Sequence, residues 1–115
     1  MTLDTNLKHV TSSAELNKLI TDNENVMVCC GRMGPMCVPV YAIMEELEKS
    51  GEYDSVVFRD MLFDDPEAAV IRNLPECRSF RGLPFTVYYK NGKVVKATSS
   101  VQSKEQVTSI LKEVF

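Results

Sequence analysis

The order of apolar and polar residues along the chain predicts alternating strands and helices. Residues 7–10 form a short, partly apolar strand candidate, and residues 26–30 and 55–58 are apolar on both faces, as buried strands of a parallel sheet are. Between these segments, apolar residues recur at the spacing of one helix face. Two helix stripes follow: Leu16, Leu19 and Ile20 in the first, and Val40, Ile43, Met44 and Leu47 in the second.

Capping residues place the ends of these two helices. Ser12 is suited to cap the first helix, with Glu15 at capping-box spacing, and residues 22–23 end it. Pro35 suits the first turn of the second helix, where its missing N–H costs nothing. Pro39 falls inside that helix and is expected to kink or loosen its first turns, and Gly51 is placed to end it.

The second half of the chain predicts a short helix, a hairpin and a final helix. The short helix covers residues 68–74, and residues 75–82 form an irregular polar connection. Strands at 85–89 and 94–95 flank Asn91-Gly92, which favours a type I′ turn. Ser103 caps the last helix, with Gln106 in capping-box register. The order β-α-β-α-β-α-β-β-α predicts an α/β fold with one mixed sheet and helices on both faces.

Length and charge narrow the class of protein. The chain has 115 residues, which is room for one domain spanning residues 1–115. Its formal net charge is −3, so it has no basic surplus for binding nucleic acid or a membrane surface. No apolar run reaches the roughly 18 to 20 residues of a membrane span, and the polar first residues contain no secretion signal. We expect a cytoplasmic monomer.

Four cysteines are the candidate chemical groups, and three of them are clustered. Cys29 and Cys30 end a buried strand, where packing is the simplest role. The alternative is a displaced redox pair of Cys30 with Cys37, although strand alternation lets at most one of the two adjacent thiols face Cys37. Cys37 is the best candidate for a reactive thiol, because a helix N-terminus favours thiolate and Arg32 adds positive potential. Packing of Cys37 in the core is the other interpretation.

The remaining candidates point to structural roles. Cys77 lies in the polar connection, where we expect partial exposure without a redox role. His9 is the single histidine, and no close Cys/His spacing indicates a zinc site. Asp60, Asp64 and Asp65 are expected beside a turn and a helix start. We expect neither a metal nor a cofactor.

Three segments, in this element order, resemble the thioredoxin family. Met33-Gly34-Pro35-Met36 stands where the family has Cys-Gly-Pro-Cys, between a buried strand and a helix. Residues 81–86, Arg-Gly-Leu-Pro-Phe-Thr, match the segment that carries the family's cis-proline, and residues 89–94 match its Phe-Lys-Asn-Gly hairpin. The resemblance covers nearly the whole chain apart from a longer connection at residues 73–80, and it implies the thioredoxin-like fold.

The same resemblance implies that the usual chemistry is missing. Thioredoxin chemistry needs a nucleophilic thiolate at a helix N-terminus and a second thiol three residues on, and a methionine thioether supplies neither. In a second register, residues 34–37 occupy the active site, which gives Cys37 the resolving position and Gly34 the nucleophile position. No cysteine holds the nucleophile position in either register. The buried aspartate of the family is replaced by Met27, or by Val28 in the second register.

Two functions from different classes stay open. The first is a non-catalytic or redox-associated protein-binding module, in which Gly82, Leu83 and Pro84 bind an extended segment of a partner protein or peptide. The resemblance implies a cis Leu83–Pro84 bond there, and Met33 and Met36 would form an adaptable apolar patch beside it, unless they are partly buried under the connection. The second is an atypical thiol-disulfide oxidoreductase that uses Cys30 and Cys37, or Cys37 alone with a dedicated reductase.

Overall fold

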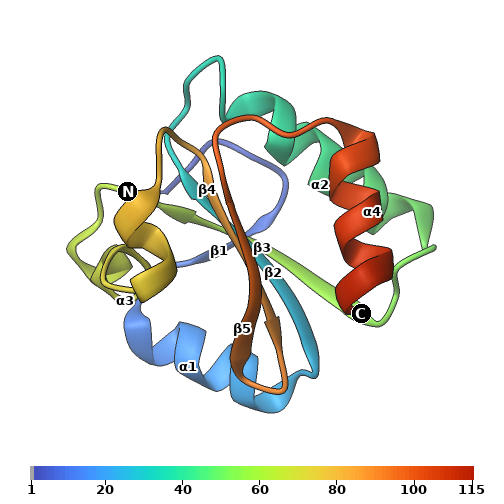
Figure 1. The fold of residues 1–115 in the computed structure, drawn as a ribbon, viewed down its shortest axis with the longest axis horizontal. Coiled ribbons are helices and arrows are strands. Elements are labelled where there is room, and N and C mark those ends of the chain that lie inside the picture. Colours follow the sequence, from blue (N-terminus) through green and yellow to red (C-terminus); the bar gives the residue numbers. More distant parts are fainter. Residues whose placement is uncertain (1) are drawn as a thin grey trace.

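A computed structural model describes residues 2–115, which form one mixed sheet covered by helices on both faces (Figure 1). The strands are β1 (Lys8–Val10), β2 (Asn25–Gly31), β3 (Val56–Leu62), β4 (Phe85–Lys90) and β5 (Lys93–Ser99). Their order across the sheet is β1-β3-β2-β4-β5, with β1 and β2 parallel to β3. β2 pairs antiparallel with β4, and β4 pairs antiparallel with β5. The predicted α/β architecture is confirmed.

Two core clusters lie on opposite faces of this sheet. Helices α2 (Val38–Ser50) and α4 (Lys104–Val114) cover one face, to which Met27 and Cys29 of β2 contribute. Helices α1 (Ser13–Asp22) and α3 (Ala69–Arg72), with the 3₁₀ turns η1 (Pro66–Ala68) and η2 (Pro75–Ser79), cover the other face. β2 is buried along its whole length, which explains why its sequence is apolar without alternation. No helix among residues 2–115 is long and apolar enough to span a bilayer.

The turns and helix caps form at the residues that the sequence predicted. Gly51 ends α2 with a φ of 75°, and Asn91 and Gly92 have φ values of 53° and 80°, as a type I′ turn requires. Ser103 and Gln106 form a complete capping box on α4. On α1 the Ser12 side chain accepts from the Glu15 backbone N–H, whereas the Glu15 carboxylate accepts from Thr11 instead of Ser12.

Helix α2 begins at Val38, three residues after the expected start at Pro35. The reason is Pro39, which has no N–H to donate to the carbonyl of Pro35, so the regular ladder cannot form one turn earlier. Residues 33–37 make a bend and a turn instead. In this turn the Gly34 carbonyl accepts the N–H groups of Cys37, at 3.1 Å, and of Val38, at 3.0 Å.

Strand β3 runs four residues past the end that the sequence predicted, to Leu62. Asp60 therefore lies inside the sheet and is fully buried, not beside a turn as expected. It pairs in register with His9 of β1 on one side and with Cys29 of β2 on the other. Paired residues of neighbouring strands point to the same face, so Asp60 shares the face of Cys29 and α2.

Candidate functional site

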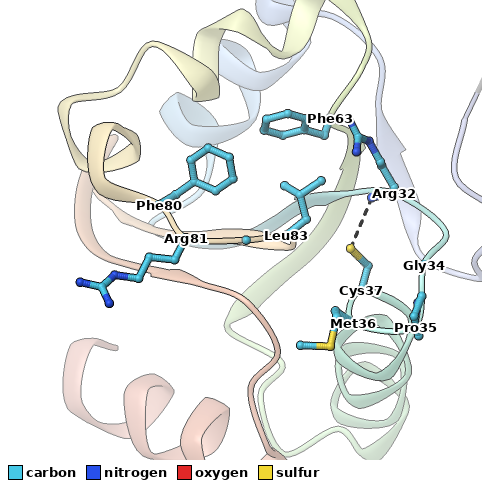
Figure 2. A pocket seen from close by; sticks show the side chains of 10 residues that line it. Arg32, Gly34, Pro35, Met36, Cys37, Phe63, Phe80, Arg81 and Leu83 are labelled. Carbon is cyan, nitrogen blue, oxygen red and sulfur yellow. Dashed lines mark hydrogen bonds between the residues drawn. The ribbon is translucent and has the colours of Figure 1, made fainter.

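A cavity of about 470 Å³ opens between the turn before α2 and the segment before β4 (Figure 2). It brings together residues far apart in the sequence, with the connections after β3 and after η2 completing its wall. The lining residues are Arg32, Gly34, Pro35, Met36, Cys37, Phe63, Phe80, Arg81, Gly82 and Leu83. The structure thus joins the predicted 33–36 loop and the predicted 82–84 segment at one site, with Met33 beside the lining and Pro84 buried beneath it.

Apolar side chains are exposed around this cavity. The described residues have six exposed large apolar side chains, and four of them belong to residues 33–38 and to Phe80. Met33 and Met36 are each 47% exposed, so about half of the surface of each residue is open to solvent. Phe80 packs with Phe63 and with the buried Phe85, with ring centroids 5.8 and 6.3 Å away, and Phe63 and Phe80 line the cavity. Clustered exposed apolar groups of this kind mark interaction surfaces.

The segment before β4 offers backbone groups to the cavity. The Leu83–Pro84 peptide bond is cis. Ser100 donates its N–H to the Gly82 carbonyl at 3.0 Å, and Ser100 itself has a left-handed φ of 70°. No group among residues 2–115 forms a backbone hydrogen bond with Leu83. Leu83 itself is half-buried and lines the cavity.

Cys37 forms part of the cavity floor but is only 3% exposed. Its Sγ accepts the backbone N–H of Arg32 at 3.5 Å, the dashed contact in Figure 2. Gly31 permits the close packing here, because a Cβ on it would lie 2.9 Å from that Sγ, 3.2 Å from Pro84 and 2.6 Å from the Tyr41 hydroxyl. That hydroxyl donates to the Arg32 carbonyl at 3.0 Å. Neither Met33 nor Gly34 offers a thiol on the open side.

The guanidinium of Arg32 forms its hydrogen bonds with Asp64 and not with the Cys37 sulfur. It forms a bidentate pair with Asp64, with both N–O distances at 2.8 Å, and lies 5.8 Å from the Phe63 ring centroid. This pairing lowers the pKa of Asp64 and raises that of Arg32. Arg32 contacts the Cys37 sulfur through its backbone N–H alone, because its side chain pairs with the Asp64 carboxylate after β3.

The other cysteines divide between the two faces of the sheet. Cys29 shares the core cluster of Cys37, whereas Cys30 lies in the opposite cluster with Cys77. The alternative interpretation, a redox pair of Cys30 with Cys37, does not fit this arrangement, because strand alternation turns Cys29, and not Cys30, toward α2. Burial raises the pKa of Cys29 well above its usual value and that of Cys30 to about 12. These two thiols are poor nucleophiles at neutral pH.

Cys77 is also buried, at 5% exposure, so the expected partial exposure is wrong. The 3₁₀ turn of η2 directs its side chain into the cluster under α3, and burial raises its pKa. All four cysteines, at positions 29, 30, 37 and 77, are free thiols.

Met27 is fully buried in the cluster of Cys37, so a thioether fills the position where the resemblance places an aspartate. The carboxylate of this face is Asp60, one strand away on β3. Asp60 accepts from Thr5, and its Oδ1 lies 2.6 Å from His9 Nδ1. Burial raises the pKa of Asp60, and the bonds to Thr5 and His9 oppose that rise. The sequence analysis placed Asp60 beside a turn, although Val56, Phe58 and Asp60 alternate on one face and indicate a longer strand.

Solved structures that share this fold include thioredoxins. A Plasmodium falciparum thioredoxin superposes with a TM-score of 0.75 at 26% identity, covering 95% of this chain and 100% of that one. Mitochondrial thioredoxin 3 from Saccharomyces cerevisiae has a TM-score of 0.75 at 18% identity, covering 94% and 95%. A cysteine-to-serine mutant of an Entamoeba histolytica thioredoxin has a TM-score of 0.72 at 19% identity, covering 94% and 99%. No protein-family model and no curated protein matches the sequence. The chain therefore has the thioredoxin fold.

Proposed function

We propose that this chain is a thioredoxin-like protein-binding module that holds an extended segment of a partner protein in the cavity. The observation that carries the proposal is the contrast between exposed apolar groups and a buried thiol. Met36 is 47% and Phe80 38% exposed, whereas Cys37 is 3% exposed. A site built for thiol exchange needs its sulfur accessible. A site built for binding needs apolar surface that a partner covers.

Two features of the cavity support recognition of an extended segment. The N–H and C=O of Leu83 can pair with the backbone of an extended segment, which gives affinity without regard to sequence. The side chains of Met36, Phe80 and Leu83 then receive one apolar side chain of that segment. Methionine suits this role because its flexible thioether adapts to different shapes.

The test is a titration of the ¹⁵N-labelled protein with a neutral, capped nine-residue peptide that has Val-Leu-Val at its centre and Gln on both flanks. We expect amide shifts confined to residues 33–37 and 80–84. Met36→Ala should weaken binding about fivefold, since truncating a well-placed apolar contact costs on the order of 1 kcal/mol. Val95→Ala is the matched control, because Val95 is 43% exposed on β5, outside the cavity lining. Equal effects of both substitutions would refute this site.

A single-thiol oxidoreductase at Cys37 is the second candidate, favoured by the place of its Sγ in the cavity floor beside Pro84. In that reaction the Cys37 thiolate attacks a partner disulfide, forms a mixed disulfide and releases one partner thiolate. A small-molecule thiol such as glutathione then attacks the mixed disulfide, which restores Cys37 and leaves the partner bound to glutathione. Insulin reduction with glutathione distinguishes the candidates. We expect no turnover above background, and turnover lost in Cys37→Ser would favour the second candidate.

A further inference from the structure

The charges around the cavity are unevenly distributed. Among the described residues, its lining includes two cations, Arg32 and Arg81, and no carboxylate. Figure 2 shows Arg32 at the end near Phe63 and Arg81 extending from the other end, beside Phe80. Between them lie the apolar groups of Phe80 and Leu83. The cavity therefore has an apolar centre with a cation toward each end, on a chain whose net charge is −3.

The two cations are not equivalent. Asp64 pairs with Arg32 through two hydrogen bonds, and this neutralises the charge at that end. Arg81 is exposed and takes part in none of the ion pairs that residues 2–115 form. Of the two cations in the cavity lining, Arg81 at the Phe80 end is therefore the one without a paired carboxylate.

We infer that the partner segment carries a carboxylate next to its apolar anchor, placed at the Arg81 end. This inference rests on the proposed function and adds the chemical class of the partner to it. An Asp or Glu side chain one or two residues from the anchor reaches the Arg81 guanidinium, while the anchor packs on Phe80 and Leu83. Complementary rim charges of this kind set partner choice more than affinity.

The test uses three capped nine-residue peptides with Val-Leu-Val at the centre and Glu, Gln or Lys on both flanks, so that either chain direction presents the charge. Binding to the ¹⁵N-labelled protein is followed at low salt and in 0.5 M NaCl. We expect the Glu peptide to bind roughly two- to fivefold tighter than the Gln peptide at low salt, the range for an exposed ion pair. The Lys peptide should bind more weakly than both, and salt should remove these differences.

Two variants separate local recognition from overall charge. Arg81→Gln should make the affinities for the Glu and Gln peptides equal. An amide spectrum that is unchanged outside residues 78–84 shows that the fold of this variant is intact. Lys93→Gln changes the net charge by the same amount at the hairpin, outside the cavity lining, and should keep the preference. Equal binding of Glu and Gln peptides to the unmodified protein, at the cavity, overturns the acidic preference alone. No shifts at the cavity with any peptide overturns the proposed function as well.

Discussion

Alanine at position 31 tests whether close packing beneath the cavity holds Cys37 in place. Gly31 is the last residue of β2, and a Cβ there would lie 2.6 Å from the Tyr41 hydroxyl and 2.9 Å from the Cys37 sulfur. Both distances are shorter than atoms tolerate, so Tyr41 and Cys37 must move. Gly34 offers a matched control three residues away, since nothing lies within 4 Å of the same added carbon.

The expected cost has two parts. Inserting a methyl group into a packed region costs about 1–3 kcal/mol. Displacing the Tyr41 hydroxyl from the Arg32 carbonyl, which it now contacts at 3.0 Å, costs about a further 1 kcal/mol. Gly31→Ala should therefore lower the free energy of unfolding by about 2–4 kcal/mol. Gly34→Ala should leave it unchanged or raise it by up to about 1 kcal/mol, through a less flexible unfolded chain.

Urea denaturation followed by circular dichroism measures these changes. The double variant Gly31→Ala/Tyr41→Phe should be about 1 kcal/mol or more stable than the sum of the two single losses in unfolding free energy predicts. The reason is that Tyr41→Phe removes the hydroxyl, which is the atom nearest to the added methyl group. A Gly31→Ala protein as stable as the parent, or a double variant with strictly additive losses, would refute the packing described here. Loss of peptide binding in Gly31→Ala, with binding kept in Gly34→Ala, would tie this packing to the cavity.

Two further predictions concern other parts of the molecule. Burial raises the pKa of Asp60, so the native state holds a proton more tightly than the unfolded state does, and acidification adds stability that Asp60→Asn lacks. The unfolding free energy of the parent minus that of Asp60→Asn should grow as pH falls through the raised pKa of Asp60, and it should level off below the unfolded-state pKa of about 3.9. Urea titrations at a series of pH values measure this difference. A difference that shrinks on acidification would contradict the raised pKa. Ser100 has a φ of 70°, so Ser100→Gly should raise stability by about 1 kcal/mol in the same assay, whereas Ser100→Val should lower it.

The sequence predicted the fold well because its signals are local. A glycine after α2, an Asn-Gly pair between β4 and β5, and a serine before α4 each determine a turn or cap within a few residues. The predicted start of α2 was three residues too early, because Pro39 has no N–H to donate to the carbonyl of Pro35. The sequence also did not predict which residues of β2 point to which face of the sheet. Because β2 is buried and apolar on both faces, its pattern does not reveal which of the two adjacent thiols faces α2.

The site was predictable only in part. The 33–36 loop and the 82–84 segment carry recognisable motifs, and the structure brings them to one cavity. Phe63 and Phe80, in contrast, stand in two connections without motifs and meet only when the chain is folded. The buried position of Asp60 was not predicted, because its partners, Thr5 and His9, lie more than fifty residues earlier in the chain.

The burial of all four thiols makes them reporters of opening motions in the folded chain. Cys29 and Cys30 are completely shielded in the central strand, so a thiol reagent reaches them only when the sheet comes apart. Cys37 precedes α2 and Cys77 lies in a single 3₁₀ turn, where a local opening suffices. Labelling should thus proceed in two phases, with Cys37 and Cys77 reacting before Cys29 and Cys30. The ratio of the two rates measures how much less free energy the local opening at the cavity costs than the unfolding of the sheet.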